Sequence, residues 1–323
     1  MKALRSKKIS RKTFLKICLS GLAVIASGTS IFKSLFAAGL AEQAPFNGRI
    51  KKNIVTDYDL VAVKGEDPYA MTVKAVQSMG GMGRFVGKNS VVVIKPNIGW
   101  DRTPGQAANT NPQVVAALVD MAFEAGAKRV NIFDITCNDP QRCYSNSGVE
   151  NTAKGKGAHV YFPDEWNPVK AHFAYASPME GWPILKDALE CDTFINVPVL
   201  KHHGLTRLTL SMKNLMGVCG GNRGIIHQDI GRKLVDLTTF INPDLTVIDA
   251  FKVLVRNGPT GGDLKDVVDM KTVLAATDPT LADAYACTLA DVDPMDVSYV
   301  RNAIERNIGK SDIKSARVAE FTV

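Results

Sequence analysis

The sequence predicts an α/β protein with a mostly parallel β-sheet, helices on both faces of that sheet, and room for a small subdomain. Two observations support this prediction. Apolar strand-like runs alternate with helical patterns along most of the chain, which is typical of parallel sheets covered by helices. One run, Ser90–Lys95 (SVVVIK), is continuous and β-branched, as expected for a strand buried on both faces.

Start and stop signals delimit the other elements. Pro68 suits the first turn of a helix, and Asn111 and Gly126 suit the N-cap and the end of the next one. The sequence predicts strands at Leu60–Lys64, Ser90–Lys95, Val130–Asp134, Ala158–Phe162, Thr193–Val197, Leu245–Ala250 and Thr272–Ala276, and helices at Pro68–Met79, Pro112–Ala125, Ile184–Leu189, Thr206–Gly217, Lys233–Ile241, Pro279–Leu289 and Asp296–Asn307. No repeat interrupts residues 42–323, so we expect a single domain there.

The basic excess of the chain belongs to its N-terminus. The net charge is +7, but residues 1–41 hold eight Lys or Arg and no Asp or Glu. Subtracting these eight from the 39 basic residues leaves 31 against 32 acidic residues in the remainder. A nucleic-acid partner is therefore not expected, because the body lacks the surplus of positive charge that tracks a phosphate backbone.

Residues 1–41 have the layout of an export signal, with a basic start, an apolar run over Ile17–Ser30 and a small-residue site at Gly39–Ala41. The segment Ser10–Lys16 resembles the twin-arginine consensus, with lysine in place of the second arginine. That resemblance implies a folded cargo, the twin-arginine export machinery as a partner, and a periplasmic or other extracytoplasmic location. Cleavage after Ala41 is the leading prediction, and an uncleaved anchor is the alternative. No stable membrane span is expected after cleavage, since the run is shorter than the ~20 residues that a span needs.

Cysteine spacing gives no support for a metal cluster. The cysteines beyond the signal are Cys137, Cys143, Cys191, Cys219 and Cys287, and no Cys-x-x-Cys occurs. A cysteine-ligated iron–sulfur cluster is therefore not expected. Cys137 and Cys143 could bridge across a loop, or all five could be thiols.

Polar residues gather where predicted strands end. Lys95 and Asn97 follow one strand, Lys201 follows another, and Asp249 and Asp278 follow two more. Ligands of α/β proteins bind beyond the carboxyl ends of parallel strands, so we interpret these residues as candidate ligand contacts. Lys95 and Lys201 either converge on an acidic ligand or pair with buried aspartates, because a buried ammonium needs an anionic or carbonyl partner.

Two histidines are candidates for catalysis or metal binding. His203 closes the segment after the Thr193–Val197 strand, and His227 lies beyond the glycine-rich stretch Gly217–Gly224. If the stretch folds back, both imidazoles and Asp249 could hold a transition metal. The alternative is that each histidine is a hydrogen-bonded structural residue.

Lys213 and Asn214 lie near the end of the helix predicted at Thr206–Gly217. They either reach the same pocket as His203 or interact with the helix dipole. No Walker motif or dinucleotide fingerprint accompanies the glycine-rich stretch.

An ordered set of motifs resembles the domain-of-unknown-function family 362 over most of the chain after about residue 55. The motifs are Ile94–Asn97, Leu200–Thr206, Met212–Gly217, His227 and Ala276–Pro279. The resemblance places the family histidine at His203, and His202 replaces the usual threonine. The family is similar, at a distance, to nickel-pincer lactate racemase, which implies metal-related roles for His203 and His227. Relatives labelled as iron–sulfur proteins carry an added ferredoxin-like domain that this chain does not contain.

The leading hypothesis is an exported protein of unknown reaction that binds a small anionic or metal-containing ligand at the carboxyl edge of its sheet. As a metal- or redox-linked enzyme, it would use His203 or His227 as general base or metal ligand, Lys95 and Lys201 to hold an anion, and Asp249 to orient a histidine. The alternative is a non-catalytic binding or maturation partner of an exported redox complex.

Overall fold

The computed structural model describes residues 46–163, 168–310 and 312–323. The chain divides into two units, Met1–Ala44 and Pro45–Val323, and the second contains every described strand and helix. The predicted export segment, residues 1–41, lies outside the described residues. Within the described part of the chain, no helix combines the length and the apolar character needed to cross a membrane.

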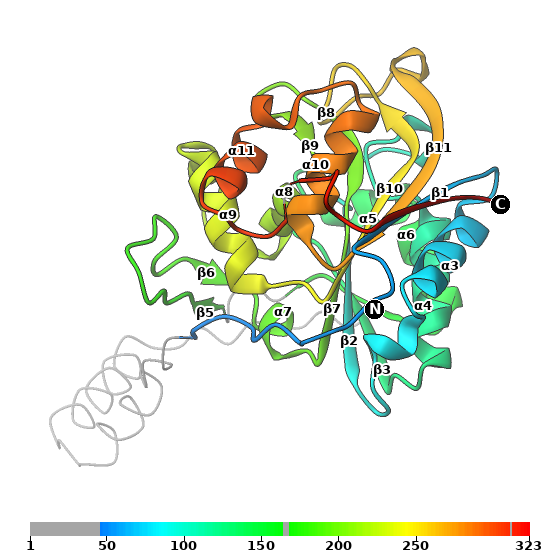
Figure 1. Ribbon diagram of the computed structural model, residues 1–323, viewed down its shortest axis with the longest axis horizontal. Helices are drawn as coiled ribbons and strands as arrows, with labels where there is room; N and C mark the ends of the chain where they lie inside the picture. The colour runs from blue at the N-terminus through cyan, green and yellow to red at the C-terminus, as the bar shows by residue number, and fades with distance from the viewer. Residues whose placement is uncertain (1–45, 164–167, 311) are drawn as a thin grey trace, which may run out of the picture. The chain divides into compact units, whose positions relative to one another are not determined.

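A mixed, mostly parallel sheet forms the centre of the fold (Figure 1). Its strands lie in the order β12 (Val318–Thr322), β1 (Leu60–Lys64), β11 (Val267–Ala276), β10 (Leu245–Leu254), β7 (Thr193–Val197), β2 (Val91–Pro96), β3 (Arg129–Ile132) and β4 (His159–Val160), and β8 (Val199–His203) and β9 (Arg207–Thr209) branch from β10. Strand β11 runs antiparallel to both neighbours, whereas the other pairs along the main order are parallel. The predicted fold class is confirmed.

Helices cover both faces of the sheet (Figure 1). They are α3 (Pro68–Ser78), α4 (Pro112–Glu124), α5 (Pro140–Asn146), α6 (Val149–Gly155), α7 (Lys186–Glu190), α8 (Ser211–Asn214), α9 (Ile230–Ile241), α10 (Pro279–Leu289) and α11 (Ser298–Glu305). Successive residues of β1 show the two-sided burial, because Leu60 packs in the core with α9, α10 and α11, and Val61 packs in the core with α3, α4 and α6. This is the period-2 alternation of a strand buried on both faces.

The helix predicted at Thr206–Gly217 is wrong over its first half. Strands β8 and β9 form an antiparallel hairpin in which Lys201 pairs with Thr209. Helix α8 begins only at Ser211, where the Asp283 carboxylate of α10 accepts hydrogen bonds from the Ser211 and Met212 N–H groups. The 3₁₀ turn η3 (Leu215–Val218) follows it. A distant aspartate and the strand pairing, not local propensity, therefore set this boundary.

Several smaller differences occur away from the central strands. Helices α5 and α6 were not predicted, although Asp139 and Pro140 give α5 a regular N-cap and first residue. Helix α7 begins two residues later than expected, because Pro183–Ile184 forms strand β6, which pairs with β5 (Val169–Lys170) in a separate two-stranded sheet.

Candidate functional site

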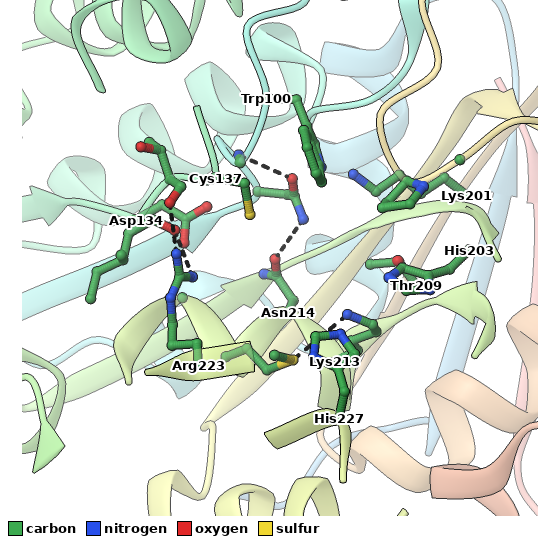
Figure 2. A pocket seen from close by; sticks show the side chains of 18 of the residues that line it. Trp100, Asp134, Cys137, Lys201, His203, Thr209, Lys213, Asn214, Arg223 and His227 are labelled. Atoms are coloured by element: carbon green, nitrogen blue, oxygen red, sulfur yellow. Dashed lines mark hydrogen bonds between the residues drawn. The ribbon is translucent and has the colours of Figure 1, made fainter. Parts of the chain in front are cut away.

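A cavity of about 590 Å³ (Figure 2) is lined by residues at and beyond the carboxyl ends of β2 and β3 and by residues of strands β8 and β9. Seven of the predicted site residues line it, namely Lys95, Asn97, Lys201, His203, Lys213, Asn214 and His227. Other residues that line it were not predicted as site residues, among them Trp100, Cys137, Thr209 and Arg223. The fold therefore brings together predicted residues that are more than a hundred positions apart in the sequence, such as Lys95 and His203.

Lys95 forms a buried ion pair in the floor of the cavity. Its Nζ lies 2.8 Å from Asp134 Oδ1 and donates hydrogen bonds to the carbonyl of Pro96 and to Asn214 Oδ1. Burial lowers the pKa of the Lys95 ammonium, and the Asp134 carboxylate opposes that shift. The second Asp134 oxygen accepts from the Ile98 N–H at 2.7 Å. Lys95 was expected either to contact an acidic ligand or to pair with a buried aspartate, and it pairs with Asp134.

Asn214 connects the two halves of the site. Its Oδ1 accepts from Asn97 Nδ2 at 3.2 Å, and its Nδ2 donates to Asn196 Oδ1 at 2.9 Å and to the carbonyl of Lys95. Because each of these groups is buried or half-buried, the amide network fixes α8 against the end of β2. Helix α8 in turn positions Lys213.

Lys201 and Lys213 bring positive charge into the cavity without a carboxylate partner among the described residues. Lys201 is completely buried, donates to the carbonyl of Ala108, and has its Nζ 5.8 Å from the ring centre of Trp100. Burial, with the nearby Lys213 charge, lowers the pKa of Lys201 to about 7. Burial lowers the pKa of Lys213 to about 8. The only hydrogen-bond contact of its Nζ among the described residues is Met216 Sδ at 3.6 Å.

Arg223 adds a third cation and fixes the loop that carries Cys137. Its guanidinium donates to the carbonyls of Ile135 and Thr136 at 2.9 and 2.6 Å. Cys137 is exposed and Cys143 is buried, and both are free thiols, so the bridge considered between them does not form. Figure 2 shows the Cys137 side chain among the residues lining the cavity.

The contacts of His203 assign its tautomer. Its Nδ1 accepts hydrogen bonds from the N–H groups of Leu205 and Thr206 at 3.1 and 3.3 Å. Because Nδ1 is an acceptor, the ring proton of the neutral imidazole is on Nε2. Burial, and then the Lys213 charge, lower the pKa of His203 to about 3. His203 is therefore a neutral hydrogen-bond donor through Nε2.

His227 has the opposite tautomer. Its Nδ1 lies 3.3 Å from the carbonyl oxygen of Gly224, and a carbonyl only accepts, so the proton is on Nδ1 and the Nε2 lone pair has no hydrogen-bond partner among the described residues. Burial and the Lys213 charge lower the pKa of His227. The two rings lie nearly parallel with centres 6.1 Å apart. The pair thus offers one donor, His203, and one acceptor, His227.

These tautomers do not fit the two-histidine transition-metal site considered from the sequence. A metal-bound histidine normally donates its second ring N–H to an acceptor, whereas His203 accepts at Nδ1 and keeps its proton on Nε2. In the described ranges, no group of three or more His, Cys, Asp or Glu side chains is arranged to hold a metal ion.

Asp249 and Asp278 lie outside the cavity, which corrects their prediction as ligand contacts. Asp249 accepts from the N–H groups of Asn111 and Phe251, and burial raises its pKa to about 6. Asp278 is the N-cap of α10, where it accepts from the Thr280 N–H. Both carboxylates therefore bind backbone donors, and Asp249 makes no hydrogen bond to a histidine among the described residues. His202 also lies outside the cavity, and its Nδ1 accepts from the Gly258 N–H.

Comparisons with known proteins identify a family and two similar proteins. The model of a family described as "Domain of unknown function (DUF362)" matches residues 92–288. The thylakoid-associated protein sll1697 of Synechocystis sp. is 27% identical over 237 residues, which is 68% of each chain. The lactate racemase apoprotein from Thermoanaerobacterium thermosaccharolyticum aligns with a TM-score of 0.46 and 12% identity, covering 78% of this chain and 61% of that one. The alignment therefore spans less than two thirds of the racemase chain.

Proposed function

The chain belongs to the domain-of-unknown-function family DUF362, and from this premise we propose that it binds a small organic anion in the cavity at the carboxyl edge of its sheet. One observation carries the proposal. Lys201, Lys213 and Arg223 converge on the cavity, and none of them forms a salt bridge within the described residues. Positive charge that is buried without a protein counter-ion is costly, and an anionic ligand would offset that cost.

The size and lining of the cavity support an organic anion rather than a simple ion. Its volume of about 590 Å³ is in the range of small-molecule sites. Apolar side chains, including Trp100, Leu205 and Met216, form much of the wall beside the cations. A ligand with an apolar part next to its anionic group would use both kinds of surface.

The two histidines and Lys201 support proton transfer to or from the bound ligand. His227 can take a proton at Nε2, and neutral His203 donates a hydrogen bond through its Nε2–H, which would stabilise negative charge on the ligand. Lys201, whose pKa is lowered to about 7, can exist as amine or ammonium near neutral pH, and such tuned groups gather at catalytic sites. This favours an enzyme over the non-catalytic partner considered from the sequence. His227, not His203, would be the general base.

Anion affinity is expected to fall as the pH rises. Lys201 and Lys213 have pKa values lowered to about 7 and about 8, and an anion favours their charged forms, so binding takes up protons. The affinity for benzoate should therefore drop by up to about tenfold for each proton and each pH unit between about pH 7 and pH 9. Titration calorimetry of the residue 42–323 protein with benzoate and with phenyl phosphate measures this directly.

Two variants make the measurement specific. Lys213→Met should weaken binding of the anions and flatten the pH dependence. Lys128→Met, at an exposed lysine outside the cavity, should change neither. If benzoate and phenyl phosphate both fail to bind at millimolar concentration, or bind with an affinity that does not change over this pH range, the proposed function is wrong.

We further propose that the protein is exported through its first 41 residues, which lie outside the described part of the structure. The twin-arginine-like segment Ser10–Lys16 and the small-residue site ending at Ala41 support this proposal. Cell fractionation should find the chain outside the cytoplasm with Glu42 as its N-terminus, and the Arg11→Gln variant should stay inside, uncut. Retention of the wild-type chain in the cytoplasm would contradict the proposal, and Lys2→Gln is the matched control.

A further inference from the structure

One hydroxyl in the wall of the cavity has no hydrogen-bond partner among the described residues. Thr209, the last residue of β9, is 4% exposed and lines the cavity. Its Oγ1 is buried, and none of the described residues makes a hydrogen bond to it. Buried hydroxyl groups are nearly always paired, because an unpaired one has lost its hydration without compensation. Thr209 therefore has a donor that the described part of the protein does not use.

The hairpin places this hydroxyl beside two other donors of the cavity. Thr209 pairs with Lys201 across β8 and β9, and directly paired residues of antiparallel strands lie on the same face. His203 is two residues beyond Lys201 and shares that face. Figure 2 shows Thr209, Lys201 and His203 together on one side of the pocket. The donors they offer are a hydroxyl, the Lys201 ammonium, which uses one of its N–H groups on the carbonyl of Ala108, and the Nε2–H of a neutral imidazole.

The other buried polar atom without a hydrogen bond in this cavity has a different explanation. Asp134 Oδ1 has no well-aligned hydrogen bond among the described residues. It lies 2.8 Å from Lys95 Nζ, however, and this ion pair compensates its negative charge. Thr209 is not part of an ion pair, and none of the described residues makes a hydrogen bond to its Oγ1. Among the described residues that line the cavity, the uncompensated buried hydroxyl is therefore the one on the β8–β9 hairpin.

We propose that Thr209 Oγ1, with Lys201 Nζ and His203 Nε2, forms an oxyanion subsite that holds the carboxylate or phosphate oxygens of the ligand. The inference rests on the proposed function and goes further, since it says which wall of the cavity holds the charged end of the ligand. Three donors on one rigid hairpin match a group of acceptor oxygens. The apolar part of the ligand then lies toward Leu205, Met216 and Trp100.

The test is a threonine-to-valine substitution with an internal control. Thr209→Val removes the hydroxyl and keeps the shape, so calorimetry should show a loss of affinity of about 10- to 100-fold, as expected for a hydrogen bond to a charged group. Thr246→Val is the matched control, because Thr246 Oγ1 is also buried without a partner among the described residues but lies on β10 outside the cavity. Both variants should unfold at the wild-type temperature or above it, since neither loses a hydrogen bond of the described structure.

Benzoate and phenyl phosphate are the probes, and they distinguish a carboxylate subsite from a phosphate subsite. Thr209→Val should weaken the binding of whichever probe binds the wild-type protein, and Thr209→Ser, which keeps the hydroxyl, should retain it. Wild-type affinity in Thr209→Val overturns the subsite and leaves the proposed function standing. Binding of neither probe to the wild type overturns both. If Thr209→Val does not fold, Thr209→Ala takes its place in the same comparison.

Discussion

The variant Lys201→Met should be more stable than the wild-type protein and should bind organic anions much more weakly. Lys201 is completely buried, and the only described group that its ammonium contacts by a hydrogen bond is the carbonyl of Ala108. Methionine has a similar unbranched shape without the charge. We expect the free energy of unfolding to rise by about 2–4 kcal/mol, after allowing for the lost hydrogen bond, and the affinity for benzoate to fall by about 100-fold.

The gain in stability should depend on pH in a way that identifies its cause. Burial lowers the pKa of Lys201 from 10.5 to about 7, so the folded protein binds fewer protons than the unfolded chain between these values. The cost of Lys201 is therefore complete below about pH 7 and disappears as the pH rises toward 10.5. Urea unfolding of both proteins across this range should show that the difference between their free energies of unfolding becomes smaller as the pH rises. A Lys201→Met protein that is less stable and still binds benzoate would show that Lys201 is a structural residue.

Gly217→Ala should be among the most destabilising single substitutions in this protein. A Cβ atom at position 217 would lie 1.7 Å from Asp134 Oδ1 and 2.6 Å from Lys95 Nζ. The added methyl group therefore cannot coexist with the buried ion pair between these two residues. Separating a buried pair leaves uncompensated charges, so we expect the free energy of unfolding to fall by about 3–5 kcal/mol, measured by urea unfolding.

Gly204→Ala is the matched control for this substitution. Gly204 also lines the cavity, but the nearest atom to a Cβ there is the carbonyl oxygen of Gly258 at 3.9 Å, an ordinary contact. We expect a change within about 0.5 kcal/mol. If Gly217→Ala were as stable as Gly204→Ala, the ion pair would not be the reason for glycine at position 217.

The sequence predicted seven of the residues that line the cavity, and three of them, Lys95, Asn97 and Lys201, came from the strand-end rule, which is local. A residue predicted in this way needs only a recognisable strand before it, as the run Ser90–Lys95 is before Asn97. The same rule did not place Asp249 and Asp278 in the cavity, because Asp249 lies inside β10, Asp278 follows β11, and both bind backbone N–H groups. A carboxylate at a strand end can serve a ligand or a neighbouring helix N-terminus, and the sequence does not distinguish them.

Thr209 could not be predicted as a cavity residue from local sequence, because its position depends on pairing between two strands. Thr209 reaches the cavity because it pairs with Lys201 in a hairpin, whereas the local pattern suggested a helix. Predicting that hairpin would have required weighing the turn at Gly204 against helical propensity. Arg223 lies in the glycine-rich stretch Gly217–Gly224, and Trp100 lies in the loop after β2. Both segments were already considered as parts of the site, so their position in the sequence could have pointed to these two residues.

The sequence by itself determined the fold class and the edge of the sheet where the cavity lies, because both follow from the order and spacing of buried runs along the chain. Only the tertiary structure decided the chemistry. The donor role of His203 comes from two backbone N–H groups beside its ring, and the acceptor role of His227 comes from one backbone carbonyl. The ion pair of Lys95 and the lack of a described carboxylate beside Lys201 arise from packing between segments distant in sequence. Protonation states and hydrogen bonds are set by such contacts over a few ångströms, which residue spacing does not encode.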